Sequence, residues 1–380
     1  MSTEVQSGLD GIKVARTALS SVDGERGILK YRGYNIDQWV NKATFEEVAY
    51  LMWYGEWPTR AQLDDLNEKL TARRSLTKYV EAVLRELPTT GAPIDSLKIT
   101  VTVLAMEDEN EDSWDIDDLR EKSITTTAIF PTALAAYHRL RNGQEPLEPL
   151  PEYGSAANFL YMVNGERPTE NAEKAFDTYL ALLAEHSMNA STFTARSTIS
   201  STTDYYSAIN SALGSLKGIA HGGANMMAMK MLMDIGSPDK VKDYVDESLE
   251  IGRRIMGIGH RIYKVRDPRV NHLMAWSEKI AAEVGDNTWY EMARTMEELT
   301  NDHPYFTQRG LYPNVEFYSA PLLYNLGFPP DLMPAVFGIS RVVGWSANIM
   351  EQVQENRLMR PQALYVGEDE QEFVPIEQRG

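Results

Sequence analysis

Hydrophobic residues recur every three or four positions along most of the chain, a spacing that places them on one face of a helix. Gly, Pro or Asp-rich segments interrupt this pattern. The pattern predicts helices over residues 75–87, 93–107, 116–142, 155–164, 168–187, 201–216, 224–235, 239–256, 268–284, 288–300 and 331–355.

Two further helix starts carry a capping signal. Thr44-Phe45-Glu46-Glu47 and Thr59-Arg60-Ala61-Gln62 each place Glu or Gln three residues after a threonine. The N-terminal segment departs from the helical pattern, because apolar residues on both sides of Asp23-Gly24 predict a short β-hairpin. The residues from Gly367 onward lack periodicity, and we expect them to form an extended arm. The fold class is therefore all-α with an N-terminal hairpin.

The chain shows neither alternating strand and helix units nor a G-x-G-x-x-G or Walker sequence, so nucleotide-binding sheets are not expected. A length of 380 residues favours more than one domain.

Charge and cysteine content exclude several classes of function. The net charge of -18 makes binding to nucleic acid or anionic lipid improbable on electrostatic grounds. Such an acidic surface is typical either of a protein adapted to high salt or of an ordinary acidic enzyme, and both interpretations stay open. With no cysteine, the chain has no disulfide, thiolate nucleophile or Cys-ligated metal. The start Met1-Ser2-Thr3-Glu4-Val5 lacks a secretory pattern, and no apolar run reaches about 18 residues, so we expect a cytoplasmic protein without a membrane span.

Two histidines stand in glycine-rich segments. His221 in Gly218-Ile219-Ala220-His221-Gly222-Gly223 precedes a predicted helix, whose positive end disfavours imidazolium and suits a neutral donor to an oxyanion. His260 begins a segment with several cations, ending at Arg269, which suits an anionic substrate. A helix-capping loop and a solvated basic loop are the competing structural interpretations.

His186 and Glu316 are further candidates. His186 lies in a dense polar cluster, Glu185 to Arg196, and Glu316 is a carboxylate between apolar neighbours, where loss of hydration would make it a usable base. A buried structural glutamate remains an alternative. The histidines lack H-E-x-x-H or another short metal-ligand spacing, and no G-x-S-x-G elbow is present. Carbon-acid chemistry by histidines and one carboxylate is the hypothesis that remains.

Segments over nearly the whole chain resemble citrate synthases, most closely the shorter bacterial and archaeal type. They include Asp23-Gly24-Glu25-Arg26-Gly27 with Tyr31-Arg32-Gly33-Tyr34, then Phe45 to Tyr50, Tyr137 to Gly143 and Asn158 to Met162, besides the histidine segments. The resemblance implies a homodimer. Each subunit would have a large helical domain, residues 1–221 and 327–380 with a C-terminal arm, and a small domain inserted at 222–326.

The resemblance also implies roles for particular residues. His221 would hold the thioester oxygen of acetyl-CoA, Glu316 would remove a methyl proton, and His260 would polarise the carbonyl of oxaloacetate. The oxaloacetate carboxylates would be bound by His186, Arg269 and Arg341, and by Arg360 of the partner subunit. CoA is assigned to Lys264, Arg266 and Asn314. No metal or redox cofactor is required.

One position departs from the family pattern, which has aspartate where this chain has Glu316. The longer side chain moves the carboxylate by about 1 Å, which is enough to change the rate on the order of a hundredfold. Three interpretations stay open: a citrate synthase, a 2-methylcitrate synthase that shares these segments and uses propionyl-CoA, and a slow or non-catalytic relative in which Glu316 replaces the usual aspartate.

Overall fold

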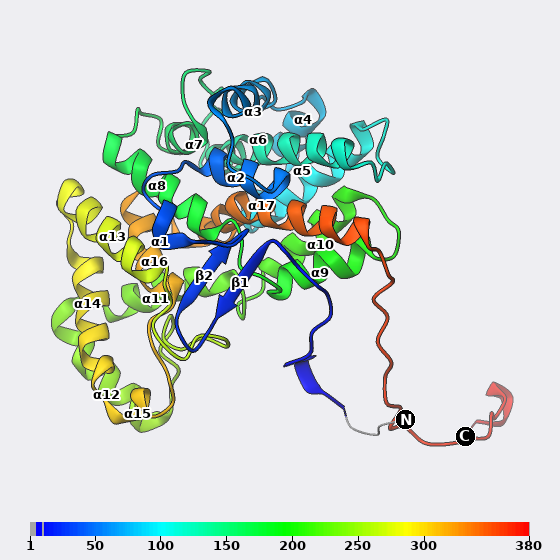
Figure 1. Cartoon of the computed structure of the whole chain (residues 1–380). Helices are drawn as coiled ribbons and strands as arrows, with labels where there is room; N and C mark the ends of the chain where they lie inside the picture. Colours follow the sequence, from blue (N-terminus) through cyan, green and yellow to red (C-terminus); the bar gives the residue numbers. More distant parts are fainter. Residues whose placement is uncertain (1–4, 10, 380) are drawn as a thin grey trace.

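The computed structural model describes residues 5–9 and 11–379. The first four residues, on which the expectation of no secretory signal partly rests, lie outside this range. Figure 1 shows a helical body from which both ends of the chain extend. The strands are β1 (Ser20–Asp23), β2 (Ile28–Tyr31) and β3 (Tyr34–Asn35), and the α-helices are α1 (Ile36–Trp39), α2 (Phe45–Tyr54), α3 (Arg60–Ala72), α4 (Lys78–Glu86), α5 (Pro93–Glu107), α6 (Ile116–Arg141), α7 (Ser155–Asn164), α8 (Glu170–Leu183), α9 (Ala190–Ile199), α10 (Tyr205–Leu216), α11 (Gly223–Ile235), α12 (Val241–Ile251), α13 (Val270–Val284), α14 (Thr288–Asn301), α15 (Pro304–Thr307), α16 (Val315–Asn325) and α17 (Met333–Gln354). Short 3-10 turns are η1 (Ser7–Leu9), η2 (Pro238–Lys240), η3 (Pro330–Leu332) and η4 (Ile376–Gln378).

The predicted all-α class with an N-terminal hairpin is confirmed. Strands β1 and β2 pair antiparallel, with Ser20 opposite Tyr31 and Asp23 opposite Ile28. The short strand β3 extends the sheet to three strands in the order β1-β2-β3. Both capping boxes are present: the Thr44 and Thr59 side chains accept from backbone N–H groups, and Glu47 and Gln62 accept in return.

Four α-helices in the described part of the chain were missed by the hydrophobic pattern: the four-residue α1 and α15, and the longer α9 and α16. Helix α9 is rich in Ser and Thr, and the side chain of its N-cap Asn189 accepts from the Thr192 backbone. Helix α16 is buried on nearly every side and contains Pro321, so no apolar stripe alternates with a polar face. The prediction for 239–256 was too long, because α12 ends at Ile251 before Gly252 in a left-handed conformation.

Helix α17 forms the centre of the core. It contacts α6, α9, α10, α2 and α8, and Figure 1 shows it crossing the middle of the body. Trp345 and Ile349 have no exposed surface. A helix that is apolar on all sides must be enclosed by other helices, which fixes where its few polar residues can point.

A second group of helices, α11 to α16, gathers at one side of the body in Figure 1. The N-terminal sheet reaches this group, because the Lys264 backbone N–H donates to the Gly24 carbonyl at 3.0 Å. His272 Nε2 also lies 2.8 Å from Asp37 Oδ1. These contacts connect the first forty residues to the loop that carries His260 and to helix α13. The division into two domains at 222 and 326 stays a prediction.

After α17 the chain leaves the body, and residues 361–379 are exposed throughout. The segment runs away from the helices in Figure 1 and carries only one short 3-10 turn. Among the described residues, none of the helices has the length and apolar character that a bilayer crossing demands.

Candidate active site

Two histidines from distant parts of the chain meet in a buried cluster. His186 follows α8, His260 lies in the loop between α12 and α13, and their ring centroids are 5.6 Å apart. Tyr263 joins them, with its hydroxyl oxygen 3.1 Å from His186 Nε2. Burial, reinforced by the nearby Arg269 cation, holds the pKa of His186 well below its usual range. His186 is therefore neutral at physiological pH.

His260 is held in one tautomer by the backbone. Its Nδ1 accepts N–H groups from Ile262 at 3.0 Å and Tyr263 at 3.2 Å. Since a backbone N–H can only donate, the imidazole proton must be on Nε2. Burial and the Arg269 cation lower the pKa of His260 to about 4. A neutral His260 thus offers an Nε2–H donor to a ligand.

His221 is held in the opposite tautomer. The Ser191 backbone N–H donates to His221 Nε2 at 3.3 Å, and Ser191 Oγ lies 2.7 Å from the same nitrogen. The indole N–H of Trp345 donates to Ser191 Oγ at 3.0 Å and so fixes the serine from α17. Burial and the Arg341 cation lower the pKa of His221 to about 4. The proton is therefore on Nδ1, ready for donation.

Glu316 lies in the first turn of α16, next to the His260 loop. Ile258 and Pro313 form an antiparallel bridge, and the Asn314 backbone N–H donates to the Gly257 carbonyl at 3.0 Å. The residue keeps some exposed surface, yet its carboxyl group is enclosed. Burial raises the pKa of Glu316 to about 7, although Arg269 opposes the shift. A carboxyl group that ionises near neutral pH suits proton removal from carbon.

Two buried arginines supply positive charge. Arg269 donates from Nε and Nη2 to the two oxygens of Asp267, at 3.0 and 2.6 Å. Burial alone would lower the pKa of Arg269, but Asp267 outweighs burial and raises it. Arg341 on α17 donates from Nε to the Leu183 carbonyl at 2.6 Å, and burial lowers its pKa to about 10. Both remain cations at neutral pH.

These groups share one electrostatic neighbourhood. The pKa of His186 is lowered, after burial, by Arg269, His260, Arg341 and His221 together. Arg269 also acts on the pKa of Glu316. Residues predicted from five separate sequence segments therefore lie near one another.

The other predicted binding residues lie around or away from this region. Lys264 is exposed, and the guanidinium of Arg266 is engaged by Glu297 at 3.1 Å. Asn314 is buried and donates from Nδ2 to the Gly259 carbonyl at 3.0 Å, so it supports the His260 loop. Arg360 is exposed after α17, where it lines a pocket between the N-terminal arm and the segment that follows α17.

A pocket of about 390 Å³ next to His260 was not predicted from the sequence. Apolar side chains and a cationic rim line it: Leu249, Ile255, Ile258, Phe306 and Leu311, with Arg253, Arg254 and Arg261. The signal that could have located it is the pair Arg253-Arg254, which flanks the Ile255–Gly259 segment in an acidic chain. Such a pocket suits a flat ring carrying phosphates.

One group of potential metal ligands occurs among the described residues. His186, His260 and Asp267 place ligand atoms within 4.8 Å of one another. However, both Asp267 oxygens bind Arg269, and the same region contains Arg341. A divalent cation would therefore meet strong repulsion there.

Comparison with known proteins gives the family. The sequence model described as "Citrate synthase, C-terminal domain" matches residues 8–362. The chain is 43% identical to citrate synthase of Haloferax volcanii over 100% of both chains. It is 38% identical to 2-methylcitrate synthase 1 of Corynebacterium glutamicum, covering 99% of each. Among solved structures it is similar to citrate synthase of Thermoplasma acidophilum in a ternary complex with carboxymethyl coenzyme A and oxaloacetate. The TM-score is 0.93 at 32% sequence identity, and the match covers 99% of this chain and 100% of that chain.

The site combines neutral imidazoles, a carboxyl group that ionises near neutrality and buried guanidinium groups. Together with these similarities, it defines an enzyme that transfers an acyl group. The helical fold is that of the similar solved structures. The chain belongs to the citrate synthase family.

Proposed function

We propose that this enzyme condenses acetyl-CoA with oxaloacetate and water to give citrate and CoA. The observation that carries the proposal is the pair of opposite, backbone-fixed tautomers, His260 with Nε2–H and His221 with Nδ1–H, in a chain that also encloses the carboxyl of Glu316 near Arg269. Two neutral donors and one base are what the condensation needs. The similar Thermoplasma acidophilum protein binds carboxymethyl coenzyme A and oxaloacetate together, which supports the proposal.

In the proposed reaction, ionised Glu316 accepts a proton from the acetyl methyl group. His221 Nδ1–H donates a hydrogen bond to the thioester oxygen, where negative charge develops. The resulting enolate carbon forms a C–C bond to the ketone carbon of oxaloacetate as the π bond of that carbonyl breaks. The ketone oxygen takes the Nε2 proton of His260, which regains a proton from solvent, and Glu316 releases the methyl proton to solvent. Water then cleaves the thioester, so that the carboxylate of citrate forms and CoA leaves as its thiol.

We propose that Arg269, Arg341 and His186 bind the oxaloacetate carboxylates. Arg269 and Arg341 offer planar guanidinium groups, and His186 offers a neutral ring. For CoA, the pocket of about 390 Å³ beside His260 suits the adenine ring, with the rim arginines near the phosphates. Lys264, Arg266 and Asn314 stay predictions as CoA ligands. The proposed steps use side chains alone, without a metal or redox cofactor.

The rival substrate is propionyl-CoA, because relatives named 2-methylcitrate synthase are 37 and 38% identical to this chain. One extra methylene changes binding in an apolar pocket by about 1–3 kcal/mol, or roughly 10- to 200-fold. Thiol release from each CoA ester, with and without oxaloacetate, measures kcat/KM for both. We expect oxaloacetate-dependent release that favours acetyl-CoA, and a preference for propionyl-CoA would assign the chain to the rival activity.

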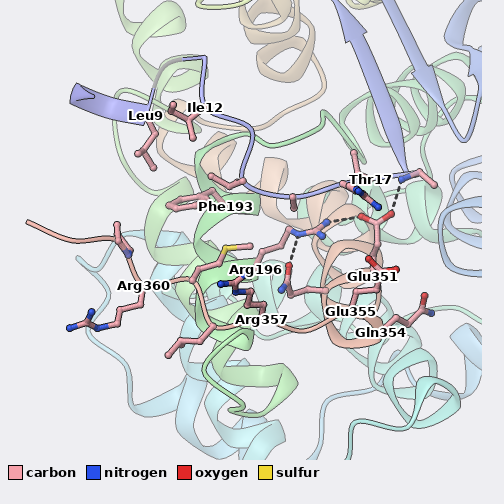
Figure 2. A pocket seen from close by; sticks show the side chains of 18 residues that line it. Leu9, Ile12, Thr17, Phe193, Arg196, Glu351, Gln354, Glu355, Arg357 and Arg360 are labelled. Atoms are coloured by element: carbon pink, nitrogen blue, oxygen red, sulfur yellow. Dashed lines mark hydrogen bonds and ion pairs between the residues drawn. The ribbon is translucent and has the colours of Figure 1, made fainter. Parts of the chain in front are cut away.

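We further propose that the active enzyme is a homodimer in which Arg360 of the partner subunit completes each site. The segment after α17 exposes Leu364, Tyr365, Val366 and Phe373 on a single chain, and burial against a second copy would remove them from water. A pocket of about 750 Å³ lies where this segment meets the N-terminal arm. Figure 2 shows Leu9 and Ile12 on one side of it and Arg357 and Arg360 on another.

Hybrid dimers test the shared site. Arg360→Ala and Glu316→Gln chains, each inactive alone, are mixed in equal amounts and allowed to exchange subunits. Half of the dimers are then hybrids, and one of the two sites in each hybrid is intact, so about a quarter of wild-type activity should return. No recovery despite verified exchange would reject the shared site.

A cytoplasmic location and a need for high salt stay predictions from the sequence.

A further inference from the structure

Glu185 is a buried carboxyl group that the proposed reaction does not use. It lies between α8 and His186 and has no exposed surface. Its Oε1 accepts a hydrogen bond from Ser20 Oγ at 2.9 Å, and its Oε2 accepts one from Asn348 Nδ2 at 3.1 Å. These partners are donors, so the surroundings can accommodate the ionised form.

Helix α17 is shaped to receive this carboxyl group. Arg341, Gly344 and Asn348 are spaced by three and four residues and so lie on one face of the helix. A Cβ atom at Gly344 would lie 2.4 Å from Glu185 Oε2 and 2.2 Å from the Ala184 carbonyl oxygen. Only glycine therefore allows the Glu185 turn to approach the helix at this point.

Glu185 and Arg341 influence each other's ionisation. Burial raises the pKa of Glu185 to about 7, and the Arg341 cation is the main opposing influence. Burial lowers the pKa of Arg341, and Glu185 is the main influence against that. The Nε of Arg341 donates to the Leu183 carbonyl, which turns this edge of the guanidinium toward the protein.

Asp267 forms an ion pair with Arg269, whereas Glu185 acts on Arg341 from the adjoining turn, which packs against Gly344 one helical turn further along α17. Oxaloacetate brings two further carboxylates to these arginines. Two carboxylates that share one cation raise each other's pKa, and the more buried one is the easier to protonate.

We propose that Glu185, buried one helical turn from Arg341 on the same face of α17, takes up a proton from solvent when a carboxylate of oxaloacetate docks on Arg341. The inference rests on the proposed function, because it assigns Arg341 to oxaloacetate. Glu185 is thus a positioning residue that acts on the substrate through Arg341. Oxaloacetate binding should then be coupled to proton uptake and should weaken as pH rises.

Other charged and titratable groups face Glu185 from the packed elements. They are Arg341 and Glu351 from α17, Tyr31 from β2, and Arg32 from the turn after β2. Burial raises the pKa of Tyr31 above its usual range, so this hydroxyl stays neutral. Neither arginine changes charge near neutrality. Glu316 has a pKa of about 7 and lies in the same site, so the experiment must separate it from Glu185.

Calorimetry of oxaloacetate binding in two buffers with different ionisation enthalpies counts the protons taken up. At pH 7.5 we expect on the order of 0.5 proton for the wild type. Uptake should be nearly abolished in Glu185→Gln and retained in the control variant Glu316→Gln. Between pH 6 and 8, Kd should rise several-fold for the wild type and much less for Glu185→Gln.

Equal uptake in the wild type and Glu185→Gln, or uptake lost in Glu316→Gln instead, would overturn this inference alone. No oxaloacetate binding by the wild type would overturn the proposed function, and the inference with it. If Glu185→Gln does not fold, Ser20→Ala removes one hydrogen bond to the carboxylate. It should move the pH of half-maximal uptake upward, and an unchanged midpoint would overturn the inference.

Discussion

Gly257 connects the segments that carry His260 and Glu316, and Gly257→Ala should uncouple them. Gly257 has φ of 80°, and its carbonyl accepts the Asn314 backbone N–H. A Cβ there would lie 2.9 Å from Phe317 Cδ2, in the residue that follows Glu316. Ordinary carbon contacts are about 3.5 Å or longer, so the two segments must separate by roughly 0.6 Å.

Two costs add in this variant. A left-handed conformation costs a residue with Cβ about 1–2 kcal/mol, and overpacking costs about 1–3 kcal/mol, which gives roughly 2–5 kcal/mol of lost stability. A shift of this size between donor and base should also lower kcat on the order of ten- to a hundredfold. Denaturant unfolding and thiol release measure the two effects.

Gly285→Ala is the matched control. Gly285 has φ of 74° at the end of α13, and a Cβ there meets nothing within 4 Å. It should lose only the conformational cost, about 1–2 kcal/mol, with unchanged kcat. If Gly257→Ala matched this control in both stability and turnover, the supposed tight coupling between the two catalytic segments would be refuted.

Three further variants test the base and its partners. Because Glu316 must be ionised to act, kcat at saturating oxaloacetate should rise with pH through about 7. Glu316→Gln should lower kcat by about 10²–10⁴-fold and should remove this rise of kcat with pH. An unchanged profile in Glu316→Gln would assign the rise to another group. Glu316→Asp should lower kcat on the order of a hundredfold, since the fixed start of α16 cannot follow the shorter side chain; turnover equal to or above wild type would show that the substrate lies within reach of aspartate. Ser191→Ala should lower kcat about tenfold with little change in KM for oxaloacetate. The variant removes the hydroxyl between His221 and Trp345 and leaves the indole N–H without its acceptor. A rise in KM alone, measured by steady-state kinetics, would contradict this prediction.

Local signals in the sequence were sufficient for most of the fold. Helices α5 and α7 have the predicted bounds, because Pro93 and Gly165 mark ends that any tertiary context respects. Helix α16 could not be found in this way, since burial on all sides erases the contrast on which periodicity depends. The exposed C-terminal arm was expected from its lack of periodicity.

The site was less accessible to sequence reasoning. Glycine-rich context and resemblance identified His221 and His260, but their tautomers depend on backbone N–H groups of Ser191 and Ile262, which only the folded loops bring near. The pocket beside His260 combines residues from 249 to 311, so no single segment reveals it. Glu185 was described only as a neighbour of His186, because its partners lie far away in the sequence.

Proton removal from the acyl group by Glu316 is the central step of this account. Exchange of the acetyl-CoA methyl protons in D2O, followed by NMR, measures that step when malate, which has no ketone to attack, occupies the oxaloacetate site. We predict exchange catalysed by the wild type and at least a hundredfold slower exchange with Glu316→Gln. Equal rates for both proteins would contradict the account.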